Sequence, residues 1–200
     1  MTTDRNDRKQ QILEALARLL EQNPGERITT AVLAKQCGVS EAALYRHFAS
    51  KARMYEALIE FAEETVFSRI NRILEEEKDS AERCSRLLFL VLGFAEKNPG
   101  ITRILLGDAL VGEQERLLDR VEQFFTRLET QLKQVLRETA MRQDAPRDLK
   151  AELSANLLLT WVEGRMHQYL RTHFRVSPLH SWDEQWRLLA DSLFHPSVSR

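Results

Sequence analysis

Residues 28–58 combine two short helical segments, a turn and the start of a longer helix, and they read ITTAVLAKQCGVSEAALYRHFASKARMYEAL. Thr29 or Thr30 can cap the first segment and Ser40 the second, because a side-chain oxygen accepts a hydrogen bond from a free backbone N–H. Gly38 stands at the turn, where the chain needs a residue that tolerates positive φ. We interpret the stretch at about 29–48 as a helix-turn-helix, a motif that reads duplex DNA.

The second helix of this motif has one apolar face and one open face. Leu44 and Phe48 are four residues apart and share a face that can be buried. Ala42, Ala43 and Arg46 lie mostly outside that face. In a helix-turn-helix, the N-terminal half of the second helix meets base edges in the major groove. The two alanines let the backbone approach closely and can touch a thymine methyl, and the arginine can bond either a guanine or a phosphate.

The composition supports an all-α protein. The 200 residues are 43% hydrophobic and 30% charged, and they include only seven glycines and five prolines. Long segments with helical periodicity dominate, and no segment reads as a strand. We predict an N-terminal helix-turn-helix domain at 1–50 and a helical dimerisation and partner-binding domain at 51–200.

Outside the motif, the sequence predicts a series of amphipathic helices. Their expected ranges are 7–21, 51–78 after a cap at Ser50, 80–97, 101–106, 113–141, 149–173 and 181–194, with a loop at 143–148. The Asn-Pro-Gly run at 98–100 is expected to break the chain before the short helix. The helix at 113–141 repeats apolar residues in steps of three and four, which fits a coiled coil or packing within one chain: Leu117, Val121, Phe124, Leu128, Leu132, Val135 and Leu136.

The distribution of charge argues against binding to nucleic acid by bulk charge alone. The formal net charge is -1, but residues 1–54 carry nine Lys and Arg against six Asp and Glu. A modest basic excess in the predicted DNA-binding segment fits a few placed contacts better than a general polycation.

Two isolated cysteines and the lack of long apolar runs point to the cytoplasm. Cys37 and Cys84 show no Cys-x-x-Cys spacing, so we expect reduced thiols that fill core space. The most apolar run, at 87–95, is far shorter than the roughly 18 residues that a membrane span needs. We expect no membrane span.

No pattern indicates an enzyme or a cofactor site. The five histidines lack the His-Glu-x-x-His spacing, and neither a glycine-rich phosphate loop nor a Gly-x-Ser-x-Gly elbow occurs. Glu163 and His167 lie one helical turn apart, but a metal needs further ligands. We expect no catalytic residues, metal or cofactor.

The segment VSEAALYRHFASKARM resembles the TetR family of bacterial regulators, whose pattern has Val-Ser, Leu-Tyr and His-Phe followed by Ser-Lys and an apolar residue. Within that family, the chain is similar to the nucleoid occlusion factors, which bind chromosomal sites and block assembly of the division GTPase FtsZ. This second resemblance rests on RITTAVLAKQCGVSEAALYRHF, IEFAEE, SRINRIL, LGFAEKNPGITRIL and QLKQVLRE. It implies a TetR-like fold and a cytoplasmic, nucleoid-associated protein.

The TetR resemblance also implies which groups touch DNA. Tyr45, His47 and Lys51 would meet backbone phosphates, and the threonines that open the motif would do so from the preceding helix. Lys51 also lies in the first turn of a long helix, where free N–H groups favour an anion. Alternatively, the tyrosine packs and the cations are only solvated. The full predicted DNA-binding set is Thr29, Thr30, Ser40, Ala42, Ala43, Tyr45, Arg46, His47 and Lys51.

Useful specificity requires two copies of such a small module on a two-fold symmetric, palindromic site. The resemblance implies a homodimer in which the last two helices of each copy form a four-helix bundle. Two tryptophans on one stripe of the final helix support a partner surface, although some of these residues can instead complete the core of one chain. The candidates are Leu158, Trp161, Tyr169, Trp182, Trp186, Leu189 and Leu193.

A surface for a protein partner is implied by the likeness to nucleoid occlusion factors. Carried over by matching segments, it comprises Phe61, Arg69, Leu90, Gly93, Lys97 and Asn98. An extended acidic or apolar peptide, in this family the C-terminal tail of FtsZ, could lie there. The sequence has Lys97 where an arginine would give bidentate carboxylate geometry. Core packing is the alternative for Phe61 and Leu90.

Most TetR-family bodies enclose a small-molecule pocket instead, and its ligand releases DNA. Four polar residues of the penultimate helix could line such a pocket, namely Thr160, Glu163, Arg165 and His167. They could equally face solvent or pair between helices, and we favour that interpretation. A transcriptional repressor controlled by a metabolite is therefore the alternative function.

Overall fold

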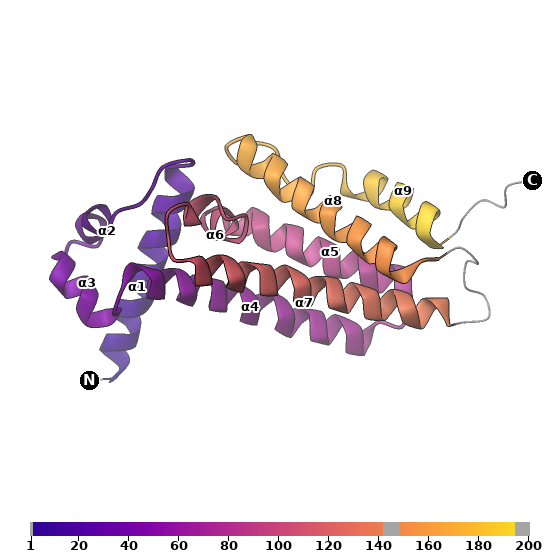
Figure 1. Cartoon of the computed structure of the whole chain (residues 1–200), viewed down its shortest axis with the longest axis horizontal. Helices are drawn as coiled ribbons and strands as arrows, with labels where there is room; N and C mark the ends of the chain where they lie inside the picture. Colours follow the sequence, from indigo (N-terminus) through magenta and orange to yellow (C-terminus); the bar gives the residue numbers. More distant parts are fainter. Residues whose placement is uncertain (1, 142–148, 195–200) are drawn as a thin grey trace, which may run out of the picture. The chain divides into compact units, whose positions relative to one another are not determined.

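The computed structural model of the chain describes residues 2–141 and 149–194, and within these ranges every regular element is helical (Figure 1). The elements are α1 (Thr2–Gln22), α2 (Thr30–Gln36), α3 (Glu41–His47), α4 (Lys51–Glu76), α5 (Ser80–Lys97), α6 (Pro99–Leu105), the 3-10 turn η1 (Asp108–Leu110), α7 (Glu115–Ala140), α8 (Ala151–Arg171) and α9 (Trp182–Phe194). The all-α prediction is confirmed. The predicted loop at 143–148 lies outside the described residues.

Most helix boundaries lie within two residues of those predicted, but α1 begins at Thr2 rather than at Asp7. The short helix after the Asn-Pro-Gly run begins at Pro99 rather than at Ile101. Proline fits the first turn of a helix because that turn needs no N–H donor, so the helix begins two residues earlier than expected. The 3-10 turn η1 was not predicted, and it follows Gly107, which has a φ of 76°.

The chain forms two compact units. The first comprises residues 1–64 and 97–122, and the second comprises residues 65–96 and 123–200. The first unit therefore takes in more of the chain than the predicted DNA-binding domain at 1–50. It includes the start of α4, all of α6 and the start of α7.

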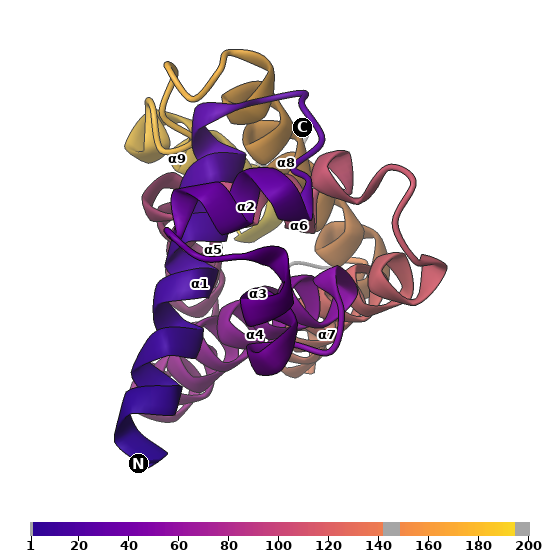
Figure 2. The same cartoon turned by 90° about the vertical axis from the view of Figure 1, so that its left-hand side faces the viewer.

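In the first unit, α1 is the helix on which α2, α3 and α6 pack (Figures 1 and 2). Ile12, Leu16 and Leu20 of α1 are fully buried. Leu44 of α3 is also fully buried and Phe48 nearly so, which confirms the predicted apolar face of the second motif helix. The two motif helices are thus held against a third by an apolar core.

The contact between α6 and α1 depends on a glycine and a buried arginine. A Cβ atom at Gly100 would lie 2.0 Å from the backbone oxygen of Ala17, so only glycine allows this approach. Arg103, 1% exposed, donates hydrogen bonds to backbone oxygens at the end of α1 and in the following loop: Leu20 at 2.8 Å, Asn23 at 2.6 Å and Glu26 at 3.1 Å. Its guanidinium also pairs with Asp108. This contact joins residues some 80 positions apart in the sequence.

In the second unit, aromatic rings and buried aliphatic side chains hold α5, α8 and α9. The Trp182 ring stacks on Trp186 at a centroid distance of 6.0 Å and lies 5.7 Å from Trp161 and 5.3 Å from Phe89. Arg165 donates to backbone oxygens of the loop between α8 and α9, at 3.0 Å to Pro178 and 2.7 Å to His180. These contacts fix the loop that was predicted around Pro178.

The repeated apolar residues of α7 are all buried within the protomer, from Leu117 to Leu136. Packing within one chain therefore explains the coiled-coil-like spacing. Cys84 is also buried, and burial raises the pKa of its thiol to about 12, which agrees with the predicted core role. Over the ranges that the structure describes, no helix is both long and apolar enough to cross a membrane.

Candidate nucleic-acid interface

Side-chain caps and one glycine shape the helix-turn-helix. The Thr29 hydroxyl oxygen accepts from the backbone N–H of Val32 at 3.3 Å, so Thr29, and not Thr30, is the cap of α2. The Ser40 hydroxyl oxygen accepts from the N–H of Ala43 at 3.2 Å and caps α3. Gly38 has a φ of 64°, as the turn requires. The predicted capping of both motif helices and the predicted turn at Gly38 are confirmed.

The open face of α3 carries the residues that the motif predicts for contact with bases. Ala42, Tyr45 and Arg46 are exposed, and Ala43 is half-buried. Tyr45 keeps 46% of its surface exposed, so packing does not account for it. Figure 2 looks onto α2 and α3, which contact each other and α1. A small, open surface flanked by one tyrosine and one arginine fits the major groove.

An acidic residue that sequence reasoning missed also lies on this face. Glu41 is the first residue of α3 and is exposed, and its Oε2 accepts a hydrogen bond from the Thr30 hydroxyl at 2.5 Å. A hydroxyl has one hydrogen to donate. Thr30 would therefore have to release Glu41 in order to donate to a phosphate. The exposed acid at the first helical position was the available signal.

Lys51 has a more enclosed setting than a solvent-facing cation. Its Nζ lies 2.6 Å from Oε1 of Glu113 and 5.3 Å from the centre of the Tyr55 ring, and 16% of its side chain is exposed. Arg27 approaches the same carboxylate at 3.4 Å. Burial, together with the Glu113 carboxylate, raises the pKa of Tyr55 to about 12. The phosphate contact of Lys51 stays a prediction, and it requires the ammonium to exchange or share its partner.

His47 ends α3, and Ser50 stands just before α4. The Nδ1 atom of His47 is buried and has no hydrogen-bond partner among the described residues, so a phosphate contact would use Nε2. The Ser50 hydroxyl oxygen accepts from the N–H of Arg53 at 3.2 Å, which confirms Ser50 as the cap of α4.

The six residues predicted for a protein partner divide between the two units. In the first unit, Phe61 is 45% exposed, Lys97 is exposed and Asn98 is half-buried. In the second, Arg69 is exposed, and Leu90 and Gly93 are half-buried, so none of the six is a fully buried core residue. Phe61 in particular is not explained by core packing.

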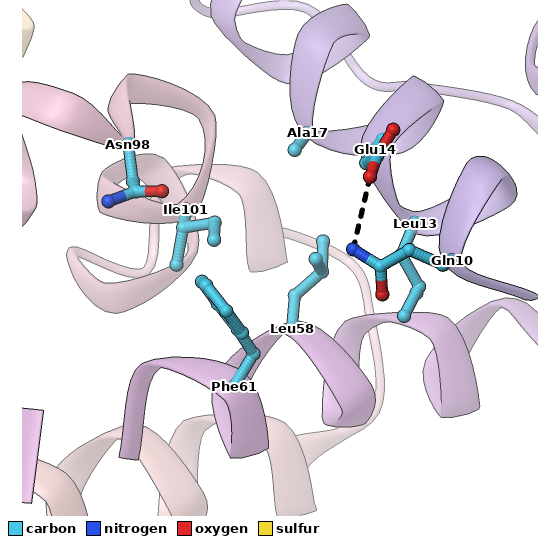
Figure 3. Close-up of a pocket in the computed structure, with 8 residues that line it drawn as sticks. All are labelled: Gln10, Leu13, Glu14, Ala17, Leu58, Phe61, Asn98 and Ile101. Atoms are coloured by element: carbon cyan, nitrogen blue, oxygen red, sulfur yellow. Dashed lines mark hydrogen bonds between the residues drawn. The ribbon is translucent and has the colours of Figure 1, made fainter. Parts of the chain in front are cut away.

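A pocket of about 160 Å³ opens in the first unit beside Phe61. Figure 3 shows the side chains of Phe61, Leu58 and Ile101 gathered on one side, with α1 on the other. Its walls come from α1, α4 and the start of α6, and the lining residues are Gln10, Leu13, Glu14, Ala17, Leu58, Phe61, Asn98 and Ile101. Gln10 donates to Glu14 at 3.1 Å along α1. Sequence reasoning found two of the eight and missed the α1 wall.

The seven predicted dimer residues differ in their exposure within the second unit, and their contact with a second copy stays a prediction. Leu158, Tyr169 and Leu193 are buried within the protomer, at 0%, 5% and 8% exposure, so they complete its core and offer little surface to a partner. The other four, Trp161, Trp182, Trp186 and Leu189, are half-buried. The exposed apolar surface of α8 and α9 instead includes three leucines that were not predicted: Leu153 at 65%, Leu157 at 48% and Leu188 at 73%.

The polar residues of α8 fit pairing within the protein better than a ligand pocket. Arg165 holds the loop to α9, and Thr160 donates to the backbone oxygen of Asn156 in its own helix. Burial raises the pKa of Glu163, although the nearby His167 opposes this shift. Among the described residues, no three His, Cys, Asp or Glu side chains gather in a way that could hold a metal ion.

Comparison with known proteins gives two family matches and many relatives. The family described as "Bacterial regulatory proteins, tetR family" matches residues 12–58, and the SlmA-like "Tetracyclin repressor-like, C-terminal domain" matches residues 78–194. The nucleoid occlusion factor SlmA of a Marinomonas species is 54% identical over 193 residues, which cover 96% of this chain and 98% of that protein. The corresponding factor of Alteromonas mediterranea is 57% identical over 182 residues, covering 91% and 93%.

Solved structures share the fold at lower identity. The TetR-family transcriptional regulator PfmR of Thermus thermophilus has a TM-score of 0.73 and 21% sequence identity, with 94% of this chain and 99% of that chain covered. The ketosteroid transcriptional regulator KstR2 of Mycobacterium tuberculosis has a TM-score of 0.74 at 18% identity, with coverage of 94% and 95%.

Proposed function

Because the chain belongs to the TetR family of DNA-binding regulators, on its branch of SlmA-type nucleoid occlusion factors, we propose how it performs that role. As a homodimer it binds palindromic sites on the chromosome through α3. Bound there, it captures the C-terminal tail of FtsZ and inhibits assembly of the division ring over the nucleoid. The protein then resides in the cytoplasm, on the nucleoid.

Dimerisation is supported by exposed apolar surface on the last two helices. Leu153 and Leu157 lie one turn apart on α8, and Leu188 lies on α9. Isolated exposed leucines are ordinary, but Leu153 and Leu157 share a face of α8 with the half-buried Trp161, at steps of four residues. A second copy would cover them. A dimer places one α3 helix on each half of a palindrome. A single short helix contacts too few bases to be specific.

The pocket beside Phe61 supports the capture of an apolar side chain from the tail. Engineered cavities of roughly 150 Å³ accept benzene, so a pocket of about 160 Å³ suits one leucine or phenylalanine side chain. Gln10, Glu14 and Asn98 supply polar groups at its wall. An apolar anchor with polar groups around it is the usual arrangement for binding a peptide.

The observation that carries the proposal is that α1 contributes to both surfaces. It packs on α2 and α3, and Arg8 of α1 donates to the backbone oxygen of Cys37 in the motif at 3.0 Å. The same helix supplies Leu13 and Ala17 to the pocket. DNA that fixes α3 also restricts α1, and therefore selects one shape of the pocket.

Light scattering by assembling FtsZ tests this function. We expect assembly to fall when the protein and its duplex are both present, and less when either is omitted. Phe61→Ala should abolish the inhibition, whereas the control Leu118→Ala should retain it, since Leu118 is exposed to a similar extent but does not line the pocket. Assembly that ignores the protein with its DNA would refute the proposal.

A further inference from the structure

Glu41 has an exposed carboxylate on the surface that meets DNA, and helix capping does not explain it. The cap of α3 is Ser40, and a capping-box acid would stand three residues later, at a position occupied by Ala43. Glu41 instead follows the cap directly and accepts a hydrogen bond from Thr30 at 2.5 Å. The carboxylate is thereby held in one place at the N-terminal end of the recognition helix.

A fixed negative charge at this place weakens binding to DNA of any sequence. Phosphates repel it, and the segment at 1–54 has only three more positive than negative side chains. The cost is offset where the carboxylate meets a hydrogen-bond donor. In the major groove, cytosine presents its N4 amino group and no acceptor, and adenine presents an N6 amino group beside its N7 acceptor, whereas guanine and thymine present acceptors.

We propose that Glu41 determines sequence specificity: its carboxylate accepts a hydrogen bond from the N4 amino group of a cytosine in each half-site. Thr30 occupies Oε2 and orients the group, which leaves Oε1 for the base. An ionised carboxylate can only accept hydrogen bonds, so a guanine or thymine at that position leaves its charge facing an acceptor. The residue therefore contributes both attraction to cytosine and repulsion of guanine and thymine.

The inference rests on DNA binding by α3 and is independent of the partner at the pocket.

Selection of duplexes from a random pool identifies the preferred site of the wild-type protein and of two variants, Glu41→Gln and the control Glu21→Gln. Glu21 is exposed at the end of α1, so its variant removes the same charge away from α3. Fluorescence anisotropy then gives affinities for the wild-type site and for a scrambled duplex of equal composition.

We expect the wild type and Glu21→Gln to select the same cytosine in each half-site and Glu41→Gln to lose that preference. Glu41→Gln should bind the wild-type site roughly 5- to 150-fold more weakly, the range for one good base contact. Its affinity for the scrambled duplex should stay the same or rise. Thr30→Val should change the ratio of the two affinities in the same direction, by a smaller factor.

Two results would overturn the inference. Equal gains in affinity on both duplexes for Glu41→Gln would mean that the carboxylate acts only through its charge. An unchanged ratio of the two affinities in Glu41→Gln, with Glu41→Ala losing binding to both duplexes and melting at a lower temperature, would mean that Glu41 only joins α2 to α3.

Discussion

The open face of α3 and the contact between α6 and α1 belong to the same unit, but water reaches them to very different degrees. Tyr45 is 46% exposed, whereas Arg103 is 1% exposed with three backbone oxygens around its guanidinium. Polar groups on the open face lie in water and are predicted to exchange it for DNA, while those of the buried contact are satisfied within the protein. Substitutions at the first surface should therefore change binding, and substitutions at the second should change folding.

The largest expected effect comes from Arg103. Arg103→Ala leaves three backbone oxygens and Asp108 without their donor in a buried setting, so we expect a loss of about 3–5 kcal/mol in the free energy of unfolding. Urea denaturation measures it, with Arg18→Ala as a control, because the Arg18–Glu14 pair is exposed. Should the alanine variant fail to fold, Arg103→Lys should show an intermediate loss. Equal stability of wild type and both variants would contradict the role given to this contact.

Gly100 should follow in size. In Gly100→Ala the new Cβ meets the backbone of Ala17, so α6 must move away from α1 at a cost of about 1–3 kcal/mol. Gly164 offers a matched control, since a Cβ there meets no atom within 4 Å. Gly164→Ala should stabilise the protein by up to about 1 kcal/mol because alanine favours the helix. Thermal unfolding of the two variants measures this contrast, and a similar shift in both would show that the close approach is not tight.

Ser40→Ala tests whether the open face depends on local geometry. Loss of this cap should cost about 1 kcal/mol of stability, with a further loss of DNA affinity because α3 frays at the end that meets the bases. Thr172→Ala provides a comparison at a helix end in the other unit, where the hydroxyl of Thr172, the residue after α8, donates to the backbone oxygen of Tyr169. DNA affinity that falls to the same degree in both would remove the special role of the α3 cap.

Lys51 belongs both to the predicted DNA surface and to an enclosed ion pair with Glu113. We expect its substitution to have the smallest effect. Because Glu113 keeps Arg27 as a second partner at 3.4 Å, Lys51→Ala should lower stability only slightly. Loss of a phosphate contact should reduce the slope of log K against log salt by about 0.9. DNA binding measured over a range of salt concentrations distinguishes the two roles. A lower stability with an unchanged slope would assign Lys51 to the protein interior alone.

The same comparison explains what the sequence could predict. Each cap joins residues three positions apart, Thr29 with Val32 and Ser40 with Ala43, and the turn depends on Gly38 alone. Such local features can be found from spacing, and they identified the motif and its open face. The Thr30–Glu41 bond spans the turn, and the bonds from Arg103 to α1 span about 80 residues. No local pattern specifies such pairs, because they depend on how the helices meet.

Periodicity likewise predicted where the helices are, but not what each apolar helix face packs against. Leu158 and Tyr169 of α8 and Leu193 of α9 were predicted as apolar face residues, and they turn toward the protomer's own core. Leu153 and Leu157 also lie on α8 and remain exposed. An apolar stripe shows that a helix is buried against something, and only the packed structure shows how much surface remains for a partner.

The measurement that tests the account most directly is the affinity of a fluorescent peptide with the sequence of the FtsZ tail, taken with and without the operator duplex. The helix α1 packs on α2 and α3 and also lines the pocket. The account therefore predicts that the duplex tightens peptide binding by about 5- to 150-fold, the usual range of coupling between sites. Phe61→Ala should remove peptide binding in both conditions while leaving the affinity for DNA unchanged. A peptide affinity that is the same with and without DNA would contradict the coupling through α1.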